Sequence, residues 1–209
     1  GETWIRQKAP GEHFTDGYFL DQEQGWLVGH EGSLAQTKDG GRNWERRESG
    51  TADANLLGIA FVNETDGFVI SSTGGLLYTT DGGNFWKGKN LNPNATLKSV
   101  AFRSEQEGWA VGVNGTILYT SDGGHQWRPI TSEATGEFAT IRFVDHRQGW
   151  IVGDGGFIFA TEDGGKQWRT IDLAKPNSSK WVTVGDTTDK LVKRYISKIS
   201  TIGMTDLDS

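Results

Sequence analysis

Short apolar stretches recur along the chain between clusters of glycine, asparagine and aspartate. Residues 57–89 contain four of them, at 57–62, 67–71, 76–80 and 85–89, and all are rich in β-branched or aromatic residues. Stretches of this length and composition, bounded by turn-forming residues, are typical of β-strands. None shows the 3.6-residue period of an amphipathic helix. The pattern predicts an all-β protein with no helix longer than about two turns.

The four-strand pattern occurs four times at a nearly fixed period. Its clearest markers are Asp39, Asp81, Asp122 and Asp163, which are spaced 42, 41 and 41 residues apart. Four strands in a repeat of about 40 residues are typical of a propeller blade, whose strands we name A to D from the inside outward. We therefore predict four complete four-stranded blades at residues 17–48, 56–90, 97–131 and 138–172. The chain should pass from one blade to the next near Ala54, Leu97 and Glu137.

Each copy contains the turn sequence T-x-D-G-G-x-x-W between strands C and D. An aspartate in such a turn accepts hydrogen bonds from nearby backbone N–H groups, and the two glycines supply left-handed backbone angles. The tryptophan buries a large ring against the hairpin. Equivalent turns on different blades lie far apart, so the four aspartates cannot converge on one substrate. We assign a structural role to Asp39, Asp81, Asp122, Asp163, Trp44, Trp86, Trp127 and Trp168.

The turn sequence matches the Asp-box, or BNR repeat, of sialidases, sortilin-type receptors and xyloglucan-degrading propellers. The longer phrase G-W-x-V-G-x-x-G-x-[IL]-x-x-T-x-D-G-G-x-x-W resembles the photosystem II stability/assembly factor family, and it covers residues 17–171. The resemblance implies a seven-bladed propeller that works in the thylakoid lumen, or outside the cytoplasm in relatives. At about 41 residues per blade such a ring requires roughly 290 residues, so we expect further blades beyond this sequence.

The two ends and one insertion depart from the repeat. Residues 4–8 resemble a lone strand D and residues 199–209 a lone strand A, so segments 1–8 and 197–209 are predicted to pair in a partial blade. Residues 173–196 interrupt the period and contain Trp181, the one tryptophan of nine that the repeat does not require. Loops added to a rigid scaffold often carry function. The alternative is that Trp181 packs the insertion against the fourth blade.

Composition limits the function. The net charge of −6 argues against nucleic acid as the main partner, because phosphate contacts require a basic surface. No apolar run is long enough to span a membrane, and the absence of cysteine excludes thiolate chemistry. The histidines His13, His30, His125 and His146 occupy unrelated repeat positions. We therefore expect no metal, no cofactor and no catalytic constellation.

The variable positions of the repeat are the candidates for binding. In a propeller, the B–C and D–A loops share one face and the Asp-box turns lie on the other. Arg142 is also unusual, since the same strand-A position holds Ala60 and Ala101. It either lines the ring opening or forms a salt bridge between blades. The candidate partner-binding residues are His30, Glu31, Thr73, Asn114, Asp154, Arg142, Trp181 and Arg194.

These observations favour a non-enzymatic, extracytoplasmic propeller that binds a protein, as an assembly factor or scaffold. The resemblance implies a membrane-protein complex, or a precursor subunit of one, as the partner. The alternative, based on the Asp-box alone, is a glycan-binding or glycoside-hydrolysing protein similar to sialidases. A glycan site would require exposed aromatic rings and carboxylates that converge on one face.

Overall fold

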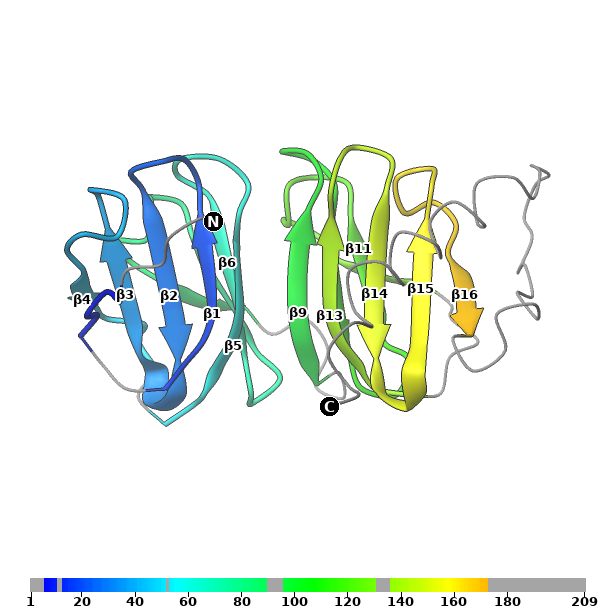
Figure 1. The fold of residues 1–209 in the computed structure, drawn as a ribbon, viewed down its shortest axis with the longest axis horizontal. Helices are drawn as coiled ribbons and strands as arrows, with labels where there is room; N and C mark the ends of the chain where they lie inside the picture. Colours follow the sequence, from blue (N-terminus) through cyan, green and yellow to red (C-terminus); the bar gives the residue numbers. More distant parts are fainter. Residues whose placement is uncertain (1–5, 11–12, 52, 90–95, 131–135, 173–209) are drawn as a thin grey trace, which may run out of the picture.

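The computed structural model describes residues 6–10, 13–51, 53–89, 96–130 and 136–172. These residues form four antiparallel four-stranded sheets, each with its strands in chain order (Figure 1). The all-β prediction is confirmed. The helices in the described part are two single 3₁₀ turns, η1 (His30–Gly32) and η2 (Asp154–Gly156). The strands of blade 1 are β1 (Phe14–Phe19), β2 (Gly25–Gly29), β3 (Leu34–Thr37) and β4 (Glu45–Arg47).

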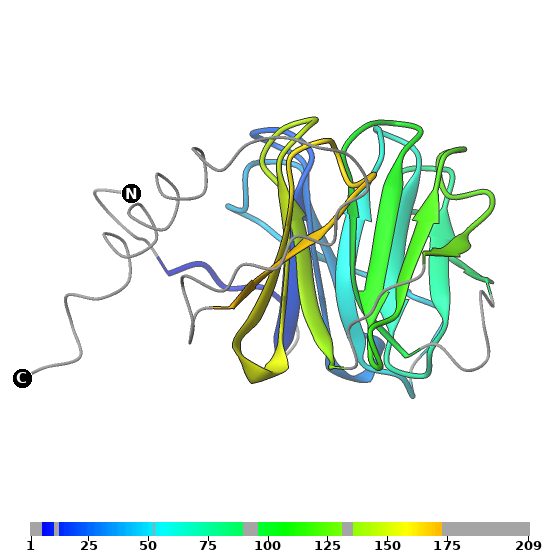
Figure 2. The same ribbon diagram turned by 90° about the vertical axis from the view of Figure 1, so that its right-hand side faces the viewer.

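Blades 2 to 4 repeat this arrangement, and they follow one another in the colour order of Figures 1 and 2. Blade 2 contains β5 (Leu56–Phe61), β6 (Gly67–Ser71), β7 (Leu76–Thr79) and β8 (Lys87–Lys89). Blade 3 contains β9 (Leu97–Phe102), β10 (Gly108–Gly112), β11 (Ile117–Thr120) and β12 (Arg128–Ile130). Blade 4 contains β13 (Phe138–Phe143), β14 (Gly149–Gly153), β15 (Phe157–Thr161) and β16 (Arg169–Asp172). Strand β1 begins three residues before Gly17, where the sequence pattern placed the start of the first blade.

The hydrophobic core lies between adjacent blades. The innermost strands contact one another in the order β1, β5, β9 and β13. The aromatic residue of one strand B stacks on the strand-A phenylalanine of the next blade, as in the Trp26–Phe61 pair with ring centres 3.9 Å apart. The other two pairs are Phe68–Phe102 at 5.1 Å and Trp109–Phe143 at 4.7 Å. Each blade is therefore packed against the next through aromatic rings, and the pairs Tyr18–Phe61 at 6.0 Å and Phe68–Trp127 at 6.2 Å add to these contacts.

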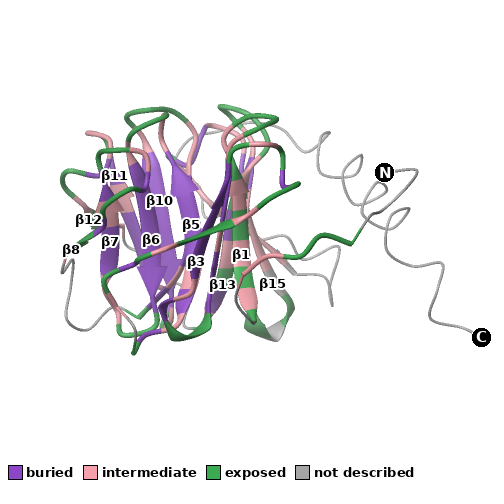
Figure 3. Ribbon diagram, turned by 90° about the vertical axis from the view of Figure 1, so that its left-hand side faces the viewer, coloured by how far each residue is buried: buried purple, intermediate pink, exposed green. Residues whose placement is uncertain are grey.

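Burial differs between the central and the outer blades. Strands β6 and β10 are buried along their whole length, whereas β1 alternates between half-buried and exposed residues (Figure 3). Phe19 in β1 is 49% exposed, although its counterpart Phe61 is 2% exposed against blade 1. The strand-A phenylalanines with a blade before them are thus better covered than Phe19: Phe61 is buried, and Phe102 and Phe143 are half-buried.

The expectations for the two ends fall largely outside the described residues. Residues 6–8 are described and form no strand, while residues 4–5 and 197–209 lie outside the described part. Pairing of the two ends remains a prediction. The insertion 173–196, with Trp181 and Arg194, also lies outside the described residues.

Candidate functional site

The B–C and D–A loops are joined into one surface by backbone hydrogen bonds. Gly32 N–H donates to the carbonyl of Ala54 in the next blade over 2.8 Å, and Gly115 N–H donates to Gly136 over 2.7 Å. Within blade 4, Asp154 N–H donates to the Glu137 carbonyl over 2.9 Å. Side-chain bonds add to these backbone bonds, since Asn55 Oδ1 accepts from Glu31 N–H and Ser49 Oγ donates to the Gly32 carbonyl over 2.9 Å. We call this surface the loop face.

Several of the predicted binding residues lie on the loop face of blade 1. His30 is exposed, and its ring lies 5.6 Å from that of His13. Glu31 is exposed as well, with a φ of 52°, and its N–H donates to the Asn55 side chain of blade 2 over 3.1 Å. A positive φ is uncommon for a residue other than glycine and turns the side chain away from the usual direction. Histidine and carboxylate groups therefore face solvent together next to the blade 1–blade 2 boundary.

The remaining loop-face candidates are spread over blades 2, 3 and 4. Thr73 is exposed and its hydroxyl pairs with that of Ser71 at 2.8 Å. Asn114 is exposed with a φ of 54°, and Asp154 is exposed in η2. The structure thus places these candidates on one face but on separate blades. A ligand that contacts all of them must be extended, as a peptide segment or a protein surface is.

Arg142 lies inside the array rather than on the loop face, and it bridges distant blades. Its Nη2 donates to Asp16 Oδ1 of blade 1 over 3.1 Å, while Nη1 donates to the Ile141 carbonyl over 3.0 Å. The side chain of Arg142 is 53% exposed and that of Asp16 is 17% exposed. The salt bridge between blades is therefore observed, whereas the lining of the ring opening by Arg142 stays a prediction.

The partner of Arg142 was missed by the sequence interpretation. Asp16 stands where the other strands A have Gly58, Ser99 and Thr140, so its acidic side chain is the available signal. Its second oxygen accepts a hydrogen bond from Ile59 N–H over 3.1 Å. Asp16 thereby connects blade 1 to both blade 2 and blade 4.

The Asp-box turns form the opposite face together with the A–B turns, to which they are hydrogen bonded. Gly82 N–H, for example, donates to the Thr65 carbonyl over 2.9 Å. In each turn a buried threonine hydroxyl donates to the aspartate and accepts from the second glycine N–H. For Thr79 these distances are 2.8 Å to Asp81 Oδ1 and 3.0 Å to Gly83 N. The sequence interpretation gave roles to the aspartate, the two glycines and the tryptophan, and it overlooked the threonine at the centre of the turn.

The aspartates complete these turns from the solvent side. The pKa of Asp81 is lowered, chiefly because its carboxylate accepts a hydrogen bond from Phe85 N–H. The pKa values of Asp39 and Asp122 are lowered for the same reason, through Asn43 N–H and Gln126 N–H. Each aspartate is thus bound within its own turn, and the four turns belong to four separate blades.

The described residues offer little support for other kinds of site. They contain no group of three or more histidine and acidic side chains placed to hold a metal ion. None of their helices has the length and apolar character needed to cross a membrane. The exposed large aromatic residues among them are Phe19 and Phe85, which lie on different blades and away from the loop face.

Comparison with known proteins identifies the family. Segments 2–94, 49–127 and 86–192 each match the family of the photosynthesis system II assembly factor YCF48. The chain belongs to the YCF48 family. A solved structure of YCF48 bound to D1 peptide is 26% identical with a TM-score of 0.65, and the match covers 78% of this chain and 56% of that chain. The present chain therefore spans about half the length of that relative.

More distant structures share the YCF48 fold. YCF48 from Cyanidioschyzon merolae is 18% identical with a TM-score of 0.50, and the match covers 82% of this chain and 88% of that one. The GH74 enzyme of Niastella koreensis is 16% identical with a TM-score of 0.64, over 79% of this chain and 30% of the enzyme. At such identities the likeness concerns the fold alone. No curated protein sequence matches this chain significantly.

Proposed function

We propose that this chain is a protein-binding propeller that helps to assemble a membrane-protein complex by holding one of its subunits or a precursor of one. The observation that carries the proposal is its membership of the YCF48 family over most of its length, since a solved member of this family is bound to D1 peptide. The proposed partner is a peptide segment of D1 or of a similar protein. As the family resemblance implies, we place this action outside the cytoplasm.

The geometry supports a peptide as the ligand. The candidates on the loop face lie on four successive blades, which suits an extended chain better than a compact small molecule. Side chains of both charge signs are available, because Glu31 and Asp154 are exposed on the loops of blades 1 and 4 while Arg142 presents a half-exposed guanidinium inside the array. Guanidinium groups recognise carboxylates through paired hydrogen bonds. We propose that Arg142 contacts an acidic group of the partner.

We further propose that binding, and not catalysis, is the function of the described blades. Each Asp-box aspartate is held within its own turn, and the exposed aromatic rings Phe19 and Phe85 do not converge on the loop face. A carbohydrate site of the kind expected for the alternative function requires such convergence. The similarity to GH74 enzymes concerns the fold alone. It therefore assigns no catalytic residue to this chain.

Titration with D1 peptide tests the proposal directly. The full chain is added to a fluorescently labelled D1 peptide and binding is followed by anisotropy. Arg142→Gln should weaken binding about tenfold or more, because a charge-assisted hydrogen bond is removed. Lys166→Gln, which removes an exposed positive charge from the Asp-box turn of the same blade, is the matched control and should change binding less than about twofold.

A double variant, His30→Ala with Glu31→Ala, locates the site on the loop face. It should also weaken binding, since it removes two exposed side chains without disturbing the backbone hydrogen bonds that position the loop. The proposed function is wrong if the wild-type chain does not bind the peptide. The proposed site is wrong if the wild-type chain binds the peptide and the Arg142→Gln and His30→Ala/Glu31→Ala variants bind it as tightly as the wild type does.

A further inference from the structure

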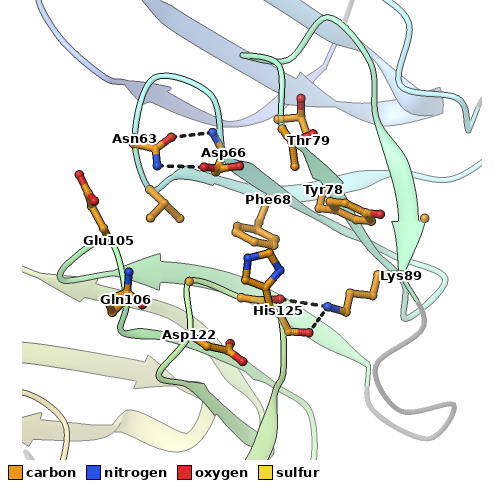
Figure 4. Close-up of a pocket in the computed structure, with 15 residues that line it drawn as sticks. Asn63, Asp66, Phe68, Tyr78, Thr79, Lys89, Glu105, Gln106, Asp122 and His125 are labelled. Atoms are coloured by element: carbon orange, nitrogen blue, oxygen red, sulfur yellow. Dashed lines mark hydrogen bonds between the residues drawn. The ribbon is translucent and has the colours of Figure 1, made fainter.

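A pocket of about 330 Å³ opens between blades 2 and 3 on the Asp-box face, away from the loop face (Figure 4). One wall comes from blade 2, with Phe68 at its base and Val62 and Asp66 from the A–B turn. The other wall is formed by the Asp-box turn of blade 3 and by Glu105 from its A–B turn. Nothing in the proposed peptide site uses this pocket, so the two are independent.

The pocket exists because two side chains are small at this blade boundary. The first position of the A–B turn holds Leu20, Val62 and Arg103 in blades 1 to 3, and the strand-B aromatic position holds Trp26, Phe68 and Trp109. Blade 2 therefore combines the smallest residue at each place. At all three boundaries the strand-B ring lies close to the second glycine of the next Asp-box, Gly83, Gly124 or Gly165, and the ring is smaller only at Gly124, where it is Phe68.

At the boundary of blades 3 and 4, the equivalent space is filled by the guanidinium of Arg103. Its Nη1 donates to the His146 carbonyl over 2.6 Å, and its Nη2 forms an ion pair with Glu107. The Cζ atom lies 5.7 Å from the centre of the Trp109 ring. An anion, a backbone carbonyl and an aromatic ring thus surround one guanidinium, whose side chain is 14% exposed.

The pocket between blades 2 and 3 retains each of these three partners. Asp66 stands at the repeat position of Glu107, Phe68 at that of Trp109, and the Glu105 carbonyl at that of His146. The two A–B turns have the same backbone hydrogen bond, Val62 N–H to Asp66 O at 2.8 Å and Arg103 N–H to Glu107 O at 3.1 Å. The Glu105 carbonyl also lies close to Gly123, as the His146 carbonyl does to Gly164.

The arginine itself is missing, because Val62 takes its place. We propose that this pocket binds the guanidinium group of an arginine side chain supplied by a protein partner. The planar guanidinium can pair with Asp66, donate to the Glu105 carbonyl and stack on Phe68, as Arg103 does one blade further on. The side-chain bonds to Asp66 from Asn63 and Thr65 both reach Oδ2, so Oδ1 can accept a further donor.

The charge of the pocket suits a cation. Asp66, Glu105 and Asp122 line it, and the basic residues among the described lining are Lys89 and His125. The Lys89 ammonium already donates to the carbonyls of Gly124, at 3.1 Å, and His125. In Figure 4, Lys89 and Glu105 lie on opposite sides of the Phe68 ring, so the lysine does not occupy the carboxylate side.

The experiment uses N-acetyl-arginine methylamide as the probe and two-dimensional NMR of the whole chain as the readout. We expect saturable shifts of the backbone amides of Asp66, Glu105 and Gly123. The citrulline analogue of the probe has nearly the same shape without the charge and should not produce them. The lysine analogue should bind at least about tenfold more weakly, because an ammonium cannot pair in the same planar manner.

Two variants test the assignment of the pocket. Val62→Arg places an internal guanidinium where Arg103 stands in blade 3 and should abolish the shifts. Asp66→Asn should raise the probe Kd at least about tenfold, whereas Glu64→Gln removes an exposed carboxylate of the same turn and should leave the Kd unchanged. The amide spectrum reports whether each variant is folded. If Val62→Arg does not fold, the probe Kd of Asp66→Asn tests by itself whether the pocket binds the guanidinium.

Three results overturn the proposal. The citrulline or lysine analogue could shift the same amides with equal affinity, Asp66→Asn could behave like Glu64→Gln, or the probe could shift amides on other blades only. None of these results bears on D1 peptide binding, which has its own assay and its own variants.

Discussion

The two faces of the blade array differ in how regularly their side-chain hydrogen bonds repeat from blade to blade. On the Asp-box face, the same side-chain bond recurs in all four blades: Thr37, Thr79, Thr120 and Thr161 each accept from a glycine N–H at 2.8–3.0 Å. On the loop face, backbone bonds such as Gly32 to Ala54 are joined by side-chain bonds that differ from blade to blade, such as Asn55 accepting from Glu31 N–H. The first arrangement requires the same residues in every blade. The second leaves the side chains free to differ, and so to bind.

The largest expected effect comes from the aromatic contacts between blades, which support both faces. Trp109→Ala should lower the free energy of unfolding by about 3–5 kcal/mol, because Trp109 is 1% exposed and packs against Phe143. Urea unfolding measures the change. The control is Phe85→Ala, which removes a ring that is 61% exposed and should change stability by less than about 0.5 kcal/mol. Equal effects of the two variants would contradict the assignment of the core to the blade boundaries.

A smaller loss is expected from one Asp-box turn. Thr79→Val keeps the shape of the side chain but leaves the buried Gly83 N–H without its acceptor, at a cost of about 1–3 kcal/mol. The neighbouring exposed Thr80→Val is the control, with an expected change below about 0.5 kcal/mol. D1 peptide binding should be the same for both. Loss of binding with unchanged stability would show that this face carries function.

Acid should weaken the Asp-box face. Since the pKa values of Asp39, Asp81 and Asp122 are lowered in the folded chain, their ionised forms stabilise it above the unfolded pKa of about 3.9. This contribution is lost as the pH falls through the lower folded values. The urea midpoint should therefore be constant from pH 7 to about pH 5 and decrease below about pH 4. The Asp81→Asn variant has no titrating group at that turn, so its urea midpoint should decrease less in acid. A urea midpoint that rises in acid would refute stabilisation by the ionised aspartates.

The smallest effect on stability is expected on the loop face. Glu31→Gly removes a side chain from a backbone with a φ of 52°, which glycine adopts without strain. Relief of this strain and the greater freedom of glycine in the unfolded chain oppose each other, so stability should change by less than about 1 kcal/mol. Binding of D1 peptide should nevertheless weaken. A large loss of stability with intact binding would reverse the roles assigned to the two faces.

Much of the fold could be predicted from the sequence because its signals are local. Strands follow from short β-branched and aromatic runs, and each Asp-box turn is completed by residues within four positions of one another, such as Thr79 and Gly83. The repeat also indicated which loops share a face. Even here the hydrogen-bond partners within a turn were incompletely predicted, since a threonine before a glycine pair gives no sign by itself that its hydroxyl is buried.

The sequence by itself therefore determined the blades, their order and the turns, because these depend on interactions between residues close along the chain. The tertiary structure alone decided which distant residues meet. Arg142 pairs with Asp16 across 126 positions, and Lys89 reaches the His125 carbonyl across 36. The same holds for the pocket beside Phe68, which appears only when blade 3 is packed against blade 2. Such contacts depend on how the sheets twist and pack, and no short sequence pattern records those angles.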